Sequence, residues 1–147
     1  MKTIKVCWQS PSNLAIVKYW GKYGTQIPMN PSLSFTLDKS YTETSIELLE
    51  GGKGNVEFFY DGNKNEKFGF KVTQFIHSLK LSYINSYDLK INSKNTFPHS
   101  AGIASSASAM SAIALCITEI EFMLEGKNIQ SEEFLRIASY RSRLGSG

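Results

Sequence analysis

The chain has 147 residues, 41% of them hydrophobic and 12% aromatic, which is enough for a single domain, residues 1–147, with a substantial core. Its net charge of +3 suits an anionic ligand. Lys and Arg are scattered among the acidic residues and form no basic run, so a nucleic-acid partner is not expected.

Cysteine and histidine are too scarce to define a covalent framework or a metal centre. Cys7 and Cys116 cannot build a disulfide scaffold, two histidines cannot complete a zinc site, and we expect both cysteines in the core. A basic leader with an apolar run is absent, as is a stretch of about 18 consecutive apolar residues. We therefore expect a soluble, cytoplasmic protein with no membrane contact.

The first half of the chain has the pattern of a β-sheet. Alternating and β-branched residues predict strands over residues 3–9, 32–38, 42–50 and 55–60, and glycine-containing segments at 51–54 and 61–63 predict turns. Residues 66 to about 84 then carry apolar side chains at helical spacing. This spacing predicts an amphipathic helix that packs one face on the sheet.

The second half returns to a strand over residues 87–93 and is then mainly helical. Residues 105–124 predict a long helix whose wide apolar band makes it the most buried one. Another helix is predicted to begin after Ser131, whose side chain can cap it, and to end near Arg141. Strands followed by helices predict an α+β fold.

The segment that leads into the long helix has the composition of a phosphate-binding loop. It reads Pro98-His99-Ser100-Ala101-Gly102-Ile103-Ala104-Ser105-Ser106-Ala107. Gly102 allows a backbone conformation that a Cβ hinders, and the helix start after it presents unpaired N–H groups and a positive dipole end to an anion. Ser105 and Ser106 add hydroxyls, and the small residues let a triphosphate approach closely. The glycine and lysine pattern of a Walker loop is absent.

The loop alone also fits a purely structural interpretation, an Ala- and Ser-rich helix start that is capped by serine and packed against a neighbour. A second pair of segments favours the nucleotide: Asn13-Leu14-Ala15-Ile16-Val17-Lys18-Tyr19-Trp20-Gly21-Lys22 and Asn30-Pro31-Ser32-Leu33-Ser34-Phe35-Thr36-Leu37. Lys18 and Lys22 lie in an apolar stretch that is expected to be buried, where charges need anions. The alternative is that both lysines reach solvent. Trp20 is expected to be a packing residue.

Together, these three segments resemble the diphosphomevalonate decarboxylase family, within the superfamily of galactokinase, homoserine kinase, mevalonate kinase and phosphomevalonate kinase (the GHMP kinases). The resemblance runs from about residue 9 to the last residue. Within the loop, Ile103 stands where Leu is usual, and His99-Ser100 where better-known members have Thr-Ala. The resemblance implies a GHMP-kinase-type N-terminal domain, an α+β fold whose mixed sheet has helices on one face.

The resemblance also implies roles in binding the substrate. Tyr19 and Lys22 hold its diphosphate, and Lys18, the candidate catalytic residue, lies near its carboxylate and C3 hydroxyl. Ser146 contacts the diphosphate as well. Asn13 orients a carboxylate or hydroxyl, although an Asn at this place is equally compatible with a turn.

For the nucleotide, the resemblance implies ATP with Mg²⁺. Ser105 and Ser106 bind the β- and γ-phosphates or the metal, and which serine meets the metal stays open. Ser93 and Asn95 contact the nucleoside or only end a strand. The implied ATP-binding residues are Ser93, Asn95, Pro98, Gly102, Ala104, Ser105, Ser106 and Ala107. The two histidines, His77 and His99, are expected to be structural or surface residues.

The reaction implied by the resemblance is ATP-dependent decarboxylation of mevalonate 5-diphosphate to isopentenyl diphosphate, carbon dioxide, ADP and phosphate. Phosphorylation makes the tertiary hydroxyl a leaving group, and its departure leaves positive charge at C3 that the carboxylate's electrons quench. Two alternatives stay open. One is a sister kinase that phosphorylates a mevalonate-like alcohol and stops, and the other is a non-catalytic binding module of the same fold.

The last residues, Gly145-Ser146-Gly147, match the opening of the family's Gly-Ser-Gly-Ser-Ala-x-Arg-Ser segment. The family's second serine, its arginine and its catalytic aspartate lie farther downstream. We therefore expect this chain to be the N-terminal part of the enzyme and to be inactive alone. An apolar face left uncovered would favour association, of which a homodimer is one form.

Overall fold

The computed structural model describes residues 3–98 and 102–146. The main sheet has five strands in the order β1-β4-β7-β5-β6, and β2 and β3 form a separate hairpin. Neighbouring strands are antiparallel except β5 and β7, which run parallel. The elements are β1 (Ile4–Val17), β2 (Lys22–Tyr23), β3 (Ile27–Pro28), β4 (Leu33–Glu50), β5 (Val56–Tyr60), β6 (Asn63–Lys64), α1 (Glu66–Ser78), a 3-10 turn η1 (Ile84–Ser86), β7 (Tyr87–Asn95), α2 (Ser105–Glu125) and α3 (Glu132–Ser146).

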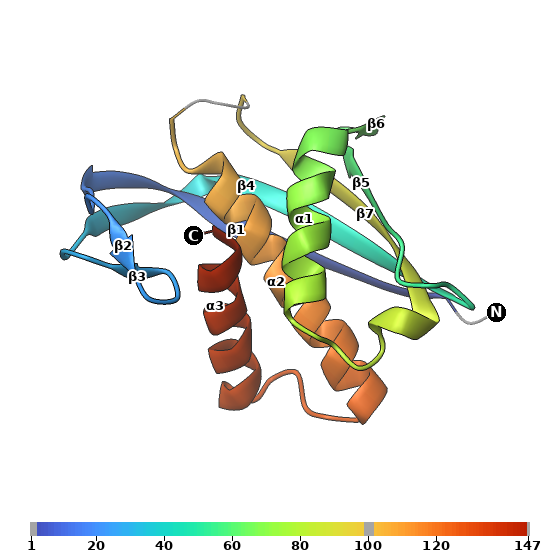
Figure 1. Ribbon diagram of the computed structural model, residues 1–147. Coiled ribbons are helices and arrows are strands. Elements are labelled where there is room, and N and C mark those ends of the chain that lie inside the picture. Colours follow the sequence, from blue (N-terminus) through green and yellow to red (C-terminus); the bar gives the residue numbers. More distant parts are fainter. Residues whose placement is uncertain (1–2, 99–101, 147) are drawn as a thin grey trace.

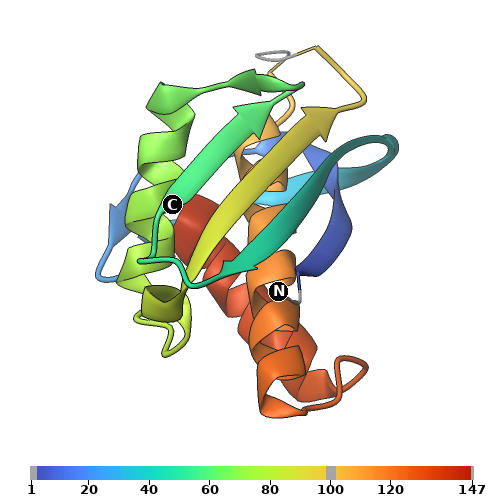
Figure 2. The same cartoon turned by 90° about the vertical axis from the view of Figure 1, so that its right-hand side faces the viewer.

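The helices lie on one side of the main sheet (Figure 1). Turned by 90°, the molecule shows the strands in front and the helices behind them (Figure 2). α1 packs on β5, α2 packs on β1 and β4, and α3 packs on α2. The predicted α+β fold, a mixed sheet with helices on one face, is confirmed.

Side chains of the strands alternate between the helix-covered core and the open face of the sheet. In β4, Ile46 and Leu48 are fully buried and their neighbours face outward. The same alternation in β1 buries Val6 and exposes Cys7. The prediction that Cys7 is a core residue is therefore wrong, whereas Cys116 is buried as predicted.

β1 and β4 are longer than their sequence patterns predict. β1 continues past residue 9 to Val17, and it tolerates Pro11 because an edge strand can lose one N–H donor. The predicted strands 32–38 and 42–50 are one strand, because the pairing with β1 resumes beyond a register break. Both strands thereby extend past the helices as a two-stranded ribbon (Figure 1).

α1 starts where predicted and ends early. Asn65 caps it by accepting the N–H of Phe68 at 3.0 Å. The helix ends at Ser78, not near residue 84, because Lys80 adopts a left-handed backbone conformation with φ of 50°. The chain then turns through η1 into β7.

α2 is the most buried helix, as predicted, and contacts β1, β4 and α3. By length and composition alone it could cross a membrane, but 61% of its most apolar stretch is buried inside the fold, as in a core helix. α3 starts after Ser131, whose Oγ accepts the N–H of Phe134 at 3.2 Å, so the predicted cap is confirmed. It continues past Arg141 because Leu144 packs on the core and Gly145 lies against Phe75.

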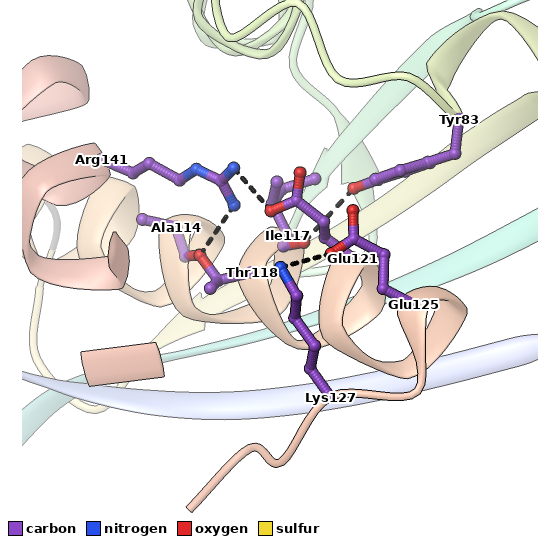
Figure 3. Close-up of polar contacts among 8 residues, drawn as sticks. All are labelled: Tyr83, Ala114, Ile117, Thr118, Glu121, Glu125, Lys127 and Arg141. Atoms are coloured by element: carbon purple, nitrogen blue, oxygen red, sulfur yellow. Dashed lines mark hydrogen bonds and ion pairs between the residues drawn. The ribbon is translucent and has the colours of Figure 1, made fainter. Parts of the chain in front are cut away.

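A polar cluster fastens α3 to α2 (Figure 3). Arg141 of α3 donates to Glu121 at 2.6 Å and to Thr118 Oγ1 at 3.2 Å. The Arg141 and Glu121 side chains are only 12% and 17% exposed. Beside them, the Tyr83 hydroxyl donates to the Ile117 carbonyl at 3.3 Å, and burial raises the pKa of Tyr83. The ion pair therefore lies where solvent screens it weakly.

Replacing Arg141 with Met is expected to lower the free energy of unfolding by about 2 kcal/mol, because Glu121 would be left largely desolvated without its cation. Urea denaturation measures the change. The double variant Arg141→Met/Glu121→Met should recover part of the loss, because no unpaired charge remains. A single variant as stable as the wild type would show that the pair contributes nothing.

At the start of β7, Asp88 holds the 51–55 turn. Its Oδ1 accepts the N–H groups of Lys53 and Asn55, both at 2.9 Å, and these bonds lower the pKa of Asp88. A lowered folded-state pKa adds stability above the unfolded-state pKa, and this stability is lost as the pH falls through the folded-state value. Asp88→Asn, which keeps an acceptor without titrating, should flatten the loss of melting temperature between neutral and acidic pH. Identical pH slopes for both proteins would contradict this expectation.

Candidate functional site

The start of α2 has an unusual backbone. Gly102 has φ of 76°, and Ala104, which precedes the first helical residue, has φ of 57° and ψ of 42°. The left-handed region is uncommon for a residue with a Cβ and is held only by its surroundings. Because the N-cap residue is Ala104, the structural alternative of a serine-capped start is wrong in that detail. His99 lies outside the described residues.

A narrow hollow, here called the β7 hollow, opens beside this helix start. It brings together four residues that the sequence assigns to ATP: Ser93 and Asn95 from the end of β7, and Ser105 and Ser106 from α2. The remaining lining residues are Phe58, Tyr60, Asn65, Phe68 and Ala109. The cavity volume is about 20 Å³, room for about one water molecule, so a nucleoside can enter only if lining side chains move.

The aromatic wall of this hollow, formed by Phe58, Tyr60 and Phe68, was not predicted from the sequence. Phe58 and Phe68 pack with ring centroids 5.1 Å apart, and burial raises the pKa of Tyr60. In the sequence these residues look like the ordinary apolar pattern of a strand and a helix. Only the folded structure, in which they lie together beside the end of β7, distinguishes them from ordinary core residues.

A chain of buried hydroxyls ties the hollow to the helix start. The Thr42 hydroxyl donates to Asn95 Oδ1 at 2.8 Å and lies 2.6 Å from the Ser108 hydroxyl. Ser108 in turn donates to the Ser105 carbonyl at 3.0 Å. This polar chain links β7, β4 and α2, and it fixes the first turn of α2 relative to the sheet.

Asn13 lies on the other side of the helix start, in the β1 pocket. This pocket also contains Ala104 and Ala107 of the predicted phosphate loop and Ser142 of α3. A third opening, the α3 pocket, joins Ser106 to Ser146 and contains Lys71 of α1, a cation that the sequence analysis did not single out. Three predicted groups of residues therefore converge around one end of α2.

The lysine segment lies farther out, where β1 and β4 form the ribbon. Lys22 Nζ donates to Gln26 Oε1 at 3.0 Å and lies 5.4 Å from the centre of the Tyr19 ring, so the two residues assigned to the diphosphate are neighbours. Lys18 is exposed. None of Lys18, Tyr19 and Lys22 lines the β7 hollow, the β1 pocket or the α3 pocket.

Two expectations about this segment are wrong. It is largely exposed and not buried, and Trp20 is 93% exposed and not a packing residue, because the ribbon extends beyond the helical layer. Hydrogen bonds hold the segment in shape instead. The Asn30 side chain accepts the N–H of Trp20 at 2.8 Å and donates to the Lys18 carbonyl at 3.3 Å. Asn30 belongs to one of the two motifs of this segment, and its role in holding the segment was not predictable from the sequence.

The family model, the curated relatives and the solved structures that this chain resembles all belong to diphosphomevalonate decarboxylases. Residues 10–147 match the model of the diphosphomevalonate decarboxylase-like N-terminal domain. Diphosphomevalonate decarboxylase from Ganoderma lucidum is 31% identical over 136 residues, which are 82% of this chain and 34% of that protein.

Two solved structures resemble the whole chain. Mevalonate diphosphate decarboxylase from Staphylococcus aureus has a TM-score of 0.79 and 31% identity, with 99% of this chain and 42% of that one covered. The enzyme from Enterococcus faecalis, studied for mevalonate diphosphate mediated ATP binding, has a TM-score of 0.74 and 32% identity over 99% and 44% of the two chains. The chain thus spans less than half the length of these relatives. Because the family model matches nearly the entire chain, this protein belongs to the family of diphosphomevalonate decarboxylase-like N-terminal domains.

Proposed function

We propose that residues 1–147 form one domain that binds Mg-ATP and mevalonate 5-diphosphate, for the ATP-dependent decarboxylation that yields isopentenyl diphosphate. The observation that carries this proposal is the convergence at the start of α2. The β7 hollow, the β1 pocket and the α3 pocket each adjoin the predicted phosphate loop, and each contains residues that the family resemblance assigns to a ligand.

For ATP, the helix start supplies the anion site. The first N–H groups of α2 have no intrahelical partners and carry the positive end of the helix dipole, and Ala104 has no polar side chain to occupy them. Pro98, Gly102 and Ala107 shape the approach of the phosphates. Ser93 and Asn95 would meet the nucleoside once the β7 hollow has opened.

The residues at this helix start are suited to an Mg²⁺ ion that is bound mainly by the phosphates of ATP and by few protein ligands. The lining of the β7 hollow offers oxygen donors from Ser105 and Ser106 and no carboxylate. Mg²⁺ commonly keeps several waters and binds through substrate phosphates with few protein ligands. When bound, it would neutralise charge on the phosphates, and one of the two serine hydroxyls would coordinate it.

For mevalonate 5-diphosphate, Lys22 and Tyr19 would hold the diphosphate, with Ser146 as a further contact. A lysine that already lies against an aromatic ring and an amide has lost much of its side-chain freedom before the anion arrives. Lys18 would approach the carboxylate and the C3 hydroxyl. Asn13, in the β1 pocket, would orient the same end of the substrate next to the phosphate loop.

The test is calorimetric titration of the chain with Mg-ATP and with mevalonate 5-diphosphate, followed by assays for ADP and carbon dioxide. Binding of both ligands without carbon dioxide release is expected, because the family's second serine, arginine and aspartate have no counterpart here. ADP formation on a mevalonate-like alcohol would favour the sister kinase. Binding of neither ligand would overturn the proposal and favour a non-catalytic module. A cytoplasmic location and a homodimer stay predictions.

A further inference from the structure

One buried hydroxyl is left without a partner in the described part of the chain. Ser12 is 1% exposed, and its Oγ makes no hydrogen bond among residues 3–98 and 102–146. Native proteins satisfy nearly all buried polar atoms, because an unpaired one has lost its water without gaining a protein partner. Such an atom therefore needs an explanation.

The position of this hydroxyl is set by an irregularity in the pairing of β1 with β4. Pro11 pairs with Tyr41 and Asn13 pairs with Thr36, so Ser12 lies at the register break between β1 and β4. A break of this kind re-aims side chains and is common next to functional sites. As a result, Ser12 and Asn13 are adjacent in sequence and both line the β1 pocket.

The β1 pocket is suited to neutral or weakly charged oxygen groups. Its volume is about 290 Å³, and none of its lining residues carries a charge. Besides Asn13, the polar lining consists of hydroxyl residues: Ser10, Ser12, Thr36, Ser108, Ser111 and Ser142. A diphosphate would demand cations, whereas an alcohol or one carboxylate is matched by hydroxyl and amide donors.

The position of the β1 pocket indicates which part of the substrate would occupy it. Ala104 and Ala107 of the predicted phosphate loop form part of its wall. Transfer of a phosphoryl group requires the accepting oxygen to lie about 3–3.5 Å from the reacting phosphorus. The substrate's reacting end must therefore adjoin this loop, while its diphosphate reaches the lysine segment.

We propose that Ser12 is a specificity-determining residue whose hydroxyl binds an oxygen of the hydroxyl-and-carboxylate end of the substrate in the β1 pocket. This inference rests on the proposed function. Among the described residues Ser12 has no partner because its partner is the ligand, and the pocket wall shifts to admit it, since the hydroxyl is closed to solvent in the free protein. Ser12 thus distinguishes mevalonate 5-diphosphate from a diphosphate that lacks those oxygens.

The test is Ser12→Ala, titrated with mevalonate 5-diphosphate, isopentenyl diphosphate and Mg-ATP. Isopentenyl diphosphate keeps the diphosphate and lacks both the carboxylate and the tertiary hydroxyl. We expect affinity for mevalonate 5-diphosphate to fall about 10-fold, and affinity for the other two ligands to stay within about 2-fold. The melting temperature of the free protein should not fall, because the removed hydroxyl has no partner among residues 3–98 and 102–146. Ser12→Thr should restore the lost affinity.

Ser108→Ala is the matched control in the same pocket. Ser108 is 3% exposed, and its hydroxyl is paired with Thr42 and Ser105, so this variant should lower the melting temperature. If the wild type binds mevalonate 5-diphosphate and Ser12→Ala binds it equally, the inference is wrong and the proposed function stands. Equal losses for all three ligands, or a lowered melting temperature, would also overturn it. If the wild type does not bind mevalonate 5-diphosphate, both the inference about Ser12 and the proposed function are wrong.

Discussion

Gly102→Val is expected to abolish Mg-ATP binding, with affinity lowered at least about 100-fold. Gly102 has φ of 76°, and no atom of the described residues lies within 4 Å of the place where a Cβ would stand. The substitution is therefore harmful through the backbone and not through a clash. A β-branched residue avoids this conformation, so the loop must rotate and its N–H groups turn away from the phosphates. Calorimetric titration measures the loss.

Gly126→Val is the matched control for this experiment. Gly126 ends the same helix, has φ of 67° and also has open space around its missing Cβ. Both variants should therefore lower the melting temperature through the same backbone strain. Only Gly102→Val should lose ATP. Unchanged ATP affinity in the folded Gly102→Val variant would show that the loop does not bind the phosphates.

Lys22→Met is expected to weaken mevalonate 5-diphosphate about 100-fold while changing ATP affinity by less than about 2-fold. The substitution would remove the charge-assisted contact that we propose between Lys22 and the diphosphate. Methionine keeps the length of the side chain and can still pack on the Tyr19 ring, so the β2–β3 hairpin should persist. The loss should shrink at high salt, because the attraction lies on an exposed part of the molecule.

Lys64→Met provides the control for general charge. Lys64 is 55% exposed in β6 and pairs with Glu57, on the far side of the main sheet from the ribbon. This variant removes one positive charge and should leave both affinities unchanged. Equal losses of both ligands in Lys22→Met, or no loss of either, would assign Lys22 a structural or solvated role.

The parts of the fold that follow from local rules were predictable from the sequence. The Ser131 cap, the apolar band of α2 and the start of α1 each depend on a few neighbouring residues. The end of α1 was missed because the left-handed conformation of Lys80 has no sequence signal. Cys7 was misplaced because cysteine was treated as a core residue by its type, whereas the alternation of β1 puts Cys7 on the outer face with Lys5 and Gln9.

In the candidate site, too, features with a local sequence pattern were predictable and features that depend on the assembled fold were not. Glycine, small residues and serines have a local pattern, which predicted a phosphate loop with Ser105 and Ser106, and the family resemblance added Ser93 and Asn95. These four residues line the β7 hollow, whereas its aromatic wall was not predicted. It placed Trp20 in the interior because a run of apolar residues does not reveal that its strand leaves the helical layer. The unpaired hydroxyl of Ser12 was not predictable, since a missing partner is a property of the assembled fold.

The polar chain from Asn95 through Thr42 and Ser108 to Ser105 determines which wall of the β7 hollow can open. Moving α2 away from β7 would separate hydroxyls that are wholly buried and leave them without partners. The opposite wall is tied to the sheet by the packing of Phe68 on Phe58 and by a backbone hydrogen bond from the Asn65 N–H to the Phe58 carbonyl at 3.1 Å. The ring contact re-forms easily after a rotation of Phe68. We therefore expect a nucleoside to enter on the side of α1 by rotation of the Phe68 ring, while the sheet, α2 and the predicted phosphate donors keep their positions.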